Sequence, residues 1–252
     1  MNVQALPKTK ELSDDINRLV TGRKPSDFEI RLLKQTLGKL KDKIDYSDYY
    51  NLSGQIASLE NNKQNIISHY ENAIKLASNN YDIYAAYSIA LYNRGFLLEC
   101  LEQLKTLNEK FPTRINKEFL GKANSSACLF KTAISLFNPI KNNNQKYFNF
   151  AQEAVSICEK SDLSDNEAQY LCTLAYSLLE TKSLYFSGYE VQIVQDCILY
   201  TIYVDLLIEE IFEINWELAG IFADNVEDMR SDVLMFEYSS VDVLEEKEKA
   251  KA

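Results

Sequence analysis

Residues that interrupt regular secondary structure are scarce in this sequence: only 7 Gly and 4 Pro occur among 252 residues. Sheet proteins need a turn about every 8–12 residues, and those turns favour Gly, Asn and Pro. The scarcity therefore favours long helices. We expect an all-α fold, and the chain is long enough to bury a sizeable core.

Motifs that carry chemistry are scarce as well. The sequence has one histidine, His69, and it has no CxxC pair, Walker A loop or GxGxxG loop. A His-rich metal site needs a second histidine, and nothing near His69 suggests a nucleophile with its base. The five cysteines lie far apart in mostly apolar surroundings, as small core residues in a reducing compartment do. We expect no enzymatic activity, no metal and no cofactor.

Signals for export and membrane insertion are missing. The start, MNVQALPKTKELSDD, contains no apolar h-region, so we expect no signal peptide. The most apolar stretch, YEVQIVQDCILYTIYVDLLIEEIF, is interrupted by acidic residues, which argues against a membrane span. We expect a cytoplasmic protein. Residues 189–213 are predicted to form a long helix that is either buried within the chain or used for contact between copies.

The charge of the chain is unevenly distributed. The formal net charge is −10, yet residues 1–204 carry 23 acidic and 23 basic residues. From Asp205 onward there are 14 Asp and Glu against 4 Lys and Arg, whereas residues 1–44 carry 10 Lys and Arg against 6 Asp and Glu. The acidic C-terminal fifth would repel nucleic acid and anionic membrane, and it would attract a basic protein partner.

Helical patterns recur along the whole chain. Ser26 and Glu29 form a capping-box pattern before an apolar stripe at Ile30, Leu33 and Leu37. A period of 34 residues relates helix pairs predicted at 46–59 with 63–77 and at 81–93 with 97–109. Further helices are predicted at about 13–20, 146–160 and 165–182, the last with a capping box at Ser164 and Glu167.

The 34-residue period resembles the tetratricopeptide repeat (TPR). The family pattern has large residues at positions 4, 7, 11 and 24, small residues at 8, 20 and 27, and Pro at 32. In the second repeat these positions fall on Tyr84, Tyr87, Ser88, Leu91, Cys100, Leu104, Leu107 and Pro112. In the first repeat they fall on Tyr50, Ser53, Gly54, Ala57, Ile66, Tyr70, Ala73 and Ser78, of which Ser53, Ala57 and Ile66 depart from the pattern. A third, degenerate unit places Leu120, Gly121, Ala133 and Phe137 at positions 7, 8, 20 and 24.

This resemblance implies a solenoid of antiparallel helix hairpins with a helical, acidic C-terminal region. We divide the chain into N-terminal helices (1–45), TPR-like repeats (46–145) and a helical C-terminal part (146–252). In the family, positions 2, 5, 9 and 12 of each first helix line the concave groove. These positions are Asp48, Asn51, Gln55 and Ser58 in the first repeat, and Asp82, Ala85, Ile89 and Tyr92 in the second. By the same register, Tyr84 and Tyr87 are core residues.

Two functions fit this sequence. The first is a non-enzymatic adaptor or chaperone-like module that binds a peptide or helix segment of another protein in the groove. The second is a stoichiometric inhibitor of the antitoxin or immunity type, which covers a basic partner with its acidic C-terminal region. Glu209, Glu213 and Glu217 recur every fourth residue and would line one helical face for that purpose. Residues 232–244 are predicted as either a short strand or a capping segment.

Overall fold

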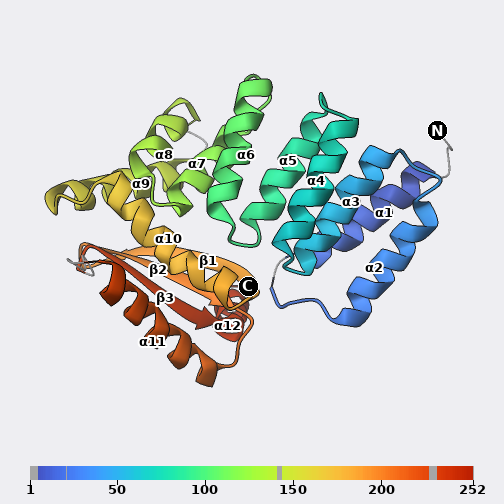
Figure 1. The fold of residues 1–252 in the computed structure, drawn as a ribbon. Helices are drawn as coiled ribbons and strands as arrows, with labels where there is room; N and C mark the ends of the chain where they lie inside the picture. The colour runs from blue at the N-terminus through green and yellow to red at the C-terminus, as the bar shows by residue number, and fades with distance from the viewer. Residues whose placement is uncertain (1–4, 21, 141–143, 227–231, 252) are drawn as a thin grey trace. The chain divides into compact units, whose positions relative to one another are not determined.

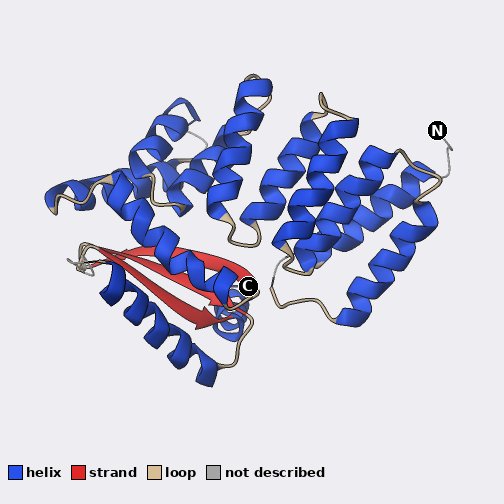
Figure 2. Ribbon diagram, viewed as in Figure 1, coloured by secondary structure: helices blue, strands red, loops and turns tan. Residues whose placement is uncertain are grey.

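The computed structural model describes residues 5–20, 22–140, 144–226 and 232–251. The chain packs into two units, residues 1–114 and residues 115–252. Figure 1 labels the helices and strands in chain order, and Figure 2 distinguishes helices from strands. Among its described residues the first unit contains helices and connecting turns but no strand, whereas the second combines helices with a small sheet.

The first unit is a series of three helix hairpins. Its helices are α1 (Ala5–Arg18), α2 (Asp27–Leu40), α3 (Tyr46–Leu59), α4 (Lys63–Leu76), α5 (Tyr81–Tyr92) and α6 (Leu97–Lys110). Each hairpin packs on the next, and the first helices also contact one another, α1 with α3 and α3 with α5. This succession of neighbouring contacts is compatible with a helical repeat. The bounds of α3 to α6 agree with the predicted helix pairs to within one residue.

Polar caps define where these helices begin. The Ser26 hydroxyl accepts a hydrogen bond from the Glu29 N–H, and the Glu29 carboxylate accepts one from the Ser26 N–H. The predicted capping box of α2 is therefore confirmed. Asn62 and Asn80 cap α4 and α5 through their side-chain oxygens. Because these caps satisfy N–H groups that a helix cannot satisfy internally, they fix the short turns between helices.

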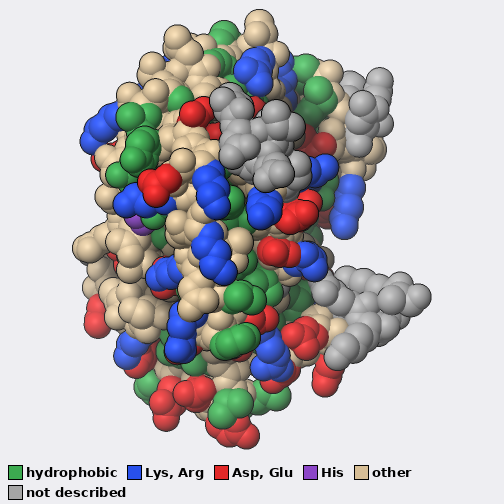
Figure 3. All heavy atoms as spheres, turned by 90° about the vertical axis from the view of Figure 1, so that its right-hand side faces the viewer, with side chains coloured by type: hydrophobic (Ala, Val, Ile, Leu, Met, Phe, Trp, Pro, Cys, Tyr) green, Lys and Arg blue, Asp and Glu red, His purple; other side chains and the backbone are tan. Residues whose placement is uncertain are grey.

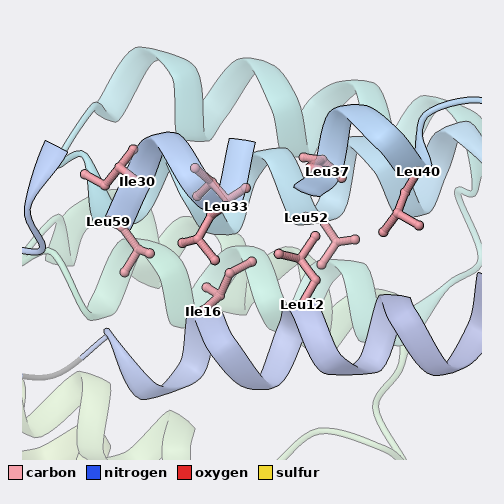
Figure 4. Packing of buried hydrophobic residues seen from close by; sticks show 9 residues of the cluster. Leu12, Ile16, Ile30, Leu33, Leu37, Leu40, Leu52 and Leu59 are labelled. Carbon is pink, nitrogen blue, oxygen red and sulfur yellow. The ribbon is translucent and has the colours of Figure 1, made fainter. Parts of the chain in front are cut away.

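The core of the first unit begins between α1, α2 and α3. Figure 4 shows apolar side chains of the three helices pointing toward one another. The cluster comprises Leu12, Ile16, Ile30, Leu33, Leu37, Leu40, Leu52, Ile56 and Leu59. The buried residues of α2 recur every three or four positions, as the predicted stripe requires. The helix α1 begins at Ala5, earlier than the predicted start at Ser13.

A glycine allows close packing within the second hairpin. A Cβ atom at Gly54 of α3 would lie 2.6 Å from the Tyr70 ring of α4. Tyr70 is fully buried and stacks on Tyr87 of α5, with ring centroids 4.9 Å apart. Tyr84 and Tyr87 are each 3% exposed, which confirms their predicted place in the core. The small residue at 54 therefore lets two hairpins share one aromatic stack.

Along the chain of the second unit, helices come before, between and after the strands. These are α7 (Lys117–Ser126), α8 (Phe130–Phe137), the 3₁₀ turn η1 (Asn138–Ile140), α9 (Gln145–Lys160), α10 (Asp165–Thr181), α11 (Ile208–Asn225) and α12 (Val241–Lys251). Gly121 and Phe137 repeat the contact of Gly54 and Tyr70, since a Cβ at Gly121 would lie 2.6 Å from the Phe137 ring. The capping box at Ser164 and Glu167 is confirmed at the start of α10.

The sheet has three strands, β1 (Phe186–Val194), β2 (Cys197–Val204) and β3 (Leu234–Ser240), in the order β1-β2-β3. β1 and β2 form an antiparallel hairpin, and β3 pairs with β2 in parallel. The crossover from β2 to β3 runs through α11. Figure 2 shows the strands of this sheet in red among the helices of the second unit.

The two faces of the sheet meet different helices. On one face the Tyr200 hydroxyl donates to the Ser125 carbonyl oxygen, and the Tyr238 hydroxyl donates to that of Ala175 in α10. On the other face Lys247 of α12 donates to Glu190 and to the Tyr203 hydroxyl. Helical segments therefore contact both faces of the sheet, which is a layered arrangement of the kind that buries the apolar side chains of a sheet.

The all-α prediction is wrong for the second unit, as is the predicted helix over 189–213. That segment holds most of the β1–β2 hairpin and only the start of α11. Gln195 and Asp196 have φ of 51° and 63°, and they form the two-residue turn of the hairpin. Of residues 232–244, the strand β3 takes Leu234–Ser240. Residues 227–231 and 252 of the predicted acidic region lie outside the described residues.

Candidate protein-binding surfaces

The predicted groove positions lie on α3 and α5, the first helices of adjacent hairpins. These helices contact one another directly, so the residues predicted for the two repeats belong to neighbouring helices. The two sets differ in character. The set on α3 is polar and half-buried or buried, and the set on α5 combines an exposed acid with apolar side chains.

On α3, the polar groups are only partly satisfied within the chain. Asp48, Asn51 and Gln55 are half-buried, whereas Ser58 is 3% exposed and donates its hydroxyl hydrogen to the Gln55 carbonyl oxygen at 2.7 Å. The side-chain oxygen of Asn51 is buried and has no hydrogen-bond partner among the described residues. A buried acceptor without a donor costs about 1–3 kcal/mol. Because this oxygen is buried, a ligand could supply the donor only after the carboxamide turns toward the surface.

The Asp48 carboxyl lies one helical turn before Asn51, on the same side of α3. Burial raises the pKa of Asp48, and the nearby negative charge of Asp45 raises it further. Both effects disfavour the carboxylate form, which an approaching cation or N–H donor would favour. Asp48 and Asn51 are therefore two acceptors on one side of α3 for which no donor occurs among the described residues.

On α5, Asp82 is exposed, and its carboxylate lies 3.7 Å from the Arg114 guanidinium. That guanidinium also lies over the Tyr81 ring, 4.3 Å from its centroid. Further along α5, Ala85 and Tyr92 are half-buried and Ile89 is 44% exposed. This end of the surface is the more apolar one.

The predicted glutamate stripe lies on α11, in the second unit. Glu209 and Glu213 are exposed, and no ion pair to either occurs among the described residues. Glu217 differs, because its carboxylate accepts a hydrogen bond at 2.7 Å from Lys182, the residue that follows α10. Of the three predicted residues, two are available to a partner and the third also ties two helices together.

Sequence reasoning missed the apolar side chains beside these glutamates. Ile208, Phe212 and Trp216 are 55%, 78% and 82% exposed. Of the two expectations for residues 189–213, burial within the chain is wrong for Phe212, and contact between copies stays a prediction. The available signal was the presence of two apolar series on one helix. Ile214, Leu218 and Phe222 are buried, and Phe222 contacts Phe236 of β3, whereas Ile208, Phe212 and Trp216 repeat the same spacing on the opposite side of the helix.

The single histidine lies on α4 beside Tyr50 of α3, with ring centroids 6.1 Å apart. His69 is half-buried, and its Nδ1 has no hydrogen-bond partner among the described residues. Burial is the main cause that lowers its pKa, Lys34 lowers it further, and Glu60 opposes the shift. Within the described ranges, no group of three or more His, Cys, Asp or Glu side chains is placed to hold a metal ion.

The basic N-terminal helices carry mixed charge at their surface. Figure 3 views the side of the molecule that carries α1 and α2, where blue Lys and Arg side chains alternate with red Asp and Glu. An open depression of about 280 Å³ on this side is lined by Lys24, Asp27, Ile30, Arg31, Lys34 and Glu60. Lys34 pairs with Glu60 at 2.6 Å, so the basic residues here are partly neutralised.

Comparison with protein-family models, with curated proteins and with solved structures gave no match. No helix in the described part of the chain combines the length and the hydropathy needed to cross a membrane. The surfaces on α3, α5 and α11 are therefore interpreted from their own geometry.

Proposed function

We propose that this chain is a TPR-like, non-enzymatic module that binds a peptide or helix segment of another protein along the surface formed by α3 and α5. Under this proposal it acts as an adaptor or as a chaperone-like protein. The segment would place donor groups against Asp48 and Asn51 at one end and an apolar side chain against Ile89 and Tyr92 at the other.

The repeat assignment is supported by two equivalent contacts. In the TPR pattern, a small residue at position 8 faces a large residue at position 24. Gly54 with Tyr70 and Gly121 with Phe137 are both separated by 16 residues. In each pair an added Cβ would approach the ring to 2.6 Å. Such close approaches at the same two positions favour a shared hairpin geometry.

The observation that carries the binding proposal is the buried Asn51 oxygen without a partner. Buried acceptors in folded proteins are nearly always paired, so each unpaired one calls for an explanation. The half-buried Asp48 carboxyl one turn away has no salt bridge among the described residues and a raised pKa. A peptide N–H or a Lys or Arg side chain would pair with Asp48, and with Asn51 once its carboxamide turns toward the surface.

The proposal can be tested with a displayed library of random 12-residue peptides selected against the full chain. Selected peptides are synthesised, and their dissociation constants are measured by calorimetry. We expect Asn51→Ala and Tyr92→Ala each to weaken binding about tenfold or more, as truncation of a central contact residue does. Enriched peptides should carry Lys or Arg near one end.

Matched controls lie outside the surface. Asn108→Ala on α6 removes an exposed asparagine, and Tyr46→Ala removes a 56% exposed tyrosine at the start of α3. Both should leave the dissociation constant unchanged. If selection enriches no peptide, or if the enriched peptides bind Asn51→Ala and Tyr92→Ala as well as the parent chain, the proposal is wrong.

A further inference from the structure

The outer side of α11 presents large apolar side chains to solvent. Ile208, Phe212 and Trp216 follow one another at intervals of four residues, so they lie along one line of the helix. Phe212 and Trp216 are each more than three-quarters exposed. Exposed single apolar residues are ordinary, but a continuous line that includes two large aromatic rings is typical of an interaction site.

These side chains do not hold α11 in place. The buried residues Ile214, Leu218 and Phe222 attach the helix to the unit, and the Phe222 ring lies 6.1 Å from the Phe236 ring of β3. Asn215 adds hydrogen bonds to the backbone of β3. Since attachment uses one side of the helix, the apolar line on the other side has no role in folding that the structure reveals.

Gly220 lies on the same outer side, in the interior of α11. Apart from its chain neighbours and the adjacent backbone of α11, no described atom lies within 4 Å of the position that a Cβ would take there, and the residue does not adopt a positive φ. A glycine in a helix interior costs about 0.5–1 kcal/mol relative to alanine. Exposed Ala219 and Ala223 flank it. A helix that packs closely on this point would account for a glycine that the chain itself does not need.

The charges beside the apolar line are acidic. Glu209 and Glu213 lie along one flank and are exposed, with no cation paired to them among the described residues. A helix that lies against the line would bring its own flank next to these carboxylates. Lys or Arg on that flank would satisfy them, and the C-terminal excess of acidic residues would speed the encounter.

A second copy of the chain fits this surface less well. In a symmetric pair of antiparallel helices the same patch meets itself, so each flank lies beside the identical flank of its partner. Glu209 and Glu213 would then lie next to the same two residues of the other copy. Like charges at such positions are destabilising. The charge pattern therefore favours a basic partner over self-association.

We propose that the outer side of α11, comprising Ile208, Phe212, Trp216, Gly220, Glu209 and Glu213, binds an amphipathic helix of another protein. This helix carries Lys or Arg along one flank. Its apolar side places small residues against the two aromatic rings and a large residue over Gly220. The surface lies wholly in the second unit, so this proposal does not depend on the α3–α5 surface.

Trp216 supplies the readout, because it is the only tryptophan in the sequence. The probe is a displayed library of 18-residue amphipathic helices, with either Lys or Glu on one flank and varied apolar positions, selected against the full chain. We expect enrichment of the Lys-flank helices. Synthetic copies should shift the Trp216 emission to shorter wavelength and reduce its quenching by acrylamide. Their affinity should fall as ionic strength rises.

Three variants test the surface, and one variant is the matched control. Gly220→Leu should weaken binding at least tenfold while leaving thermal stability unchanged or higher, because open space surrounds the site and leucine favours helix. Phe212→Ala should weaken binding to a similar extent, and Glu209→Gln with Glu213→Gln should remove most of the salt dependence. Phe28→Ala removes a 70% exposed ring from α2 and should have no effect.

Each contrary result overturns the proposal. Enrichment of Glu-flank helices, or of no helix, excludes a basic helical partner. Binding that survives both Gly220→Leu and Phe212→Ala places the contact elsewhere. A shift of Trp216 emission that depends on protein concentration without peptide, together with a dimer in sedimentation equilibrium, assigns the surface to a second copy instead. Peptides selected for the α3–α5 surface should leave Trp216 emission unchanged, which keeps the two tests separate.

Discussion

The carboxamide of Asn215 forms two hydrogen bonds with the backbone of Tyr238. Its Oδ1 accepts from the Tyr238 N–H at 2.7 Å, and its Nδ2 donates to the Tyr238 carbonyl oxygen at 2.9 Å. Tyr238 belongs to β3, the outer strand next to β2. An open strand edge is a template for pairing with another chain. By occupying both backbone groups, Asn215 of α11 blocks this edge at Tyr238.

Asn215→Leu should therefore destabilise the second unit and open the β3 edge. Two half-buried backbone groups would lose their partners, at a cost of about 1–3 kcal/mol each. We expect faster hydrogen exchange at the Tyr238 amide and more self-association in light scattering. Asn225→Ala is the control, since that side chain is exposed and donates to the carbonyl oxygen of Ile221 one turn earlier. Unchanged exchange at Tyr238 in Asn215→Leu would contradict the assigned role of the carboxamide.

Gly54→Ala and Gly121→Ala should each lower the free energy of unfolding by about 1–3 kcal/mol, as overpacking of a core does. The reason is that Tyr70 and Phe137 are fully buried and cannot move away from the added methyl group. Gly38→Ala is the matched control. It also lies inside a helix but has open space around it, so it should raise the free energy of unfolding by about 0.5–1 kcal/mol. Urea titrations measure all three variants, and equal effects would refute the close-contact explanation.

The helix hairpins were predictable because their signals are local. Ser26 with Glu29 and Ser164 with Glu167 mark helix starts within four residues, and both appear in the structure as predicted. The 34-residue period placed α3 to α6 because each helix repeats the same spacing of buried residues. These patterns depend on neighbours within one or two helical turns, so the sequence alone contains them.

The β1–β2 hairpin was not predicted because its strands lack a clear alternation. β2 is buried on both faces from Tyr200 to Val204. Periodicity alone does not distinguish such a continuous buried run from a segment of a buried helix. Its turn is Gln195–Asp196, which adopts positive φ without the Asn-Gly or Asp-Gly signal. The remaining signal was the enrichment in β-branched and aromatic residues, such as Ile198, Tyr200 and Thr201.

The candidate surfaces were predictable in part, for the same reason. Helical spacing places Glu209 and Glu213 on one face of α11, as the structure has them. Exposure of Phe212 and Trp216 depends on which side of α11 meets the sheet. Contacts with residues far away in the sequence, such as Phe236, determine which side of α11 is buried. The periodicity of α11 alone carries no information about these contacts.

Asp48→Asn should stabilise the first unit and weaken binding of basic peptides to the α3–α5 surface. Burial and Asp45 raise the folded-state pKa of Asp48 above its ordinary value of 3.8. A group whose pKa is raised on folding contributes stability below its unfolded pKa, and this contribution is lost as pH rises through the folded pKa. At neutral pH the ionised carboxyl therefore opposes folding, and the amide removes that opposition. Thermal melts of Asp48→Asn should show a higher Tm.

The exposed Asp42 supplies the control for this prediction, because Asp42→Asn changes the net charge by the same amount. It should leave both Tm and peptide affinity nearly unchanged. An Asp48→Asn variant with a lower Tm would mean that the carboxylate has a stabilising partner within the chain. The interpretation of Asp48 as an acceptor without such a partner would then be wrong.

His69 should titrate below its ordinary pKa of 6.5, because burial beside Tyr50 disfavours the imidazolium form. As the only histidine in the chain, it gives a single Hε1 resonance, so an NMR titration measures its pKa directly. A pKa lowered on folding contributes stability above the unfolded pKa, and this contribution is lost as pH falls through the folded pKa. We therefore expect Tm to decline as pH falls below about 6.5, and His69→Gln to lose this part of the decline. A midpoint at or above 6.5 would mean that Glu60 outweighs burial, and the Tm of the parent chain would then rise or stay level over the same pH range.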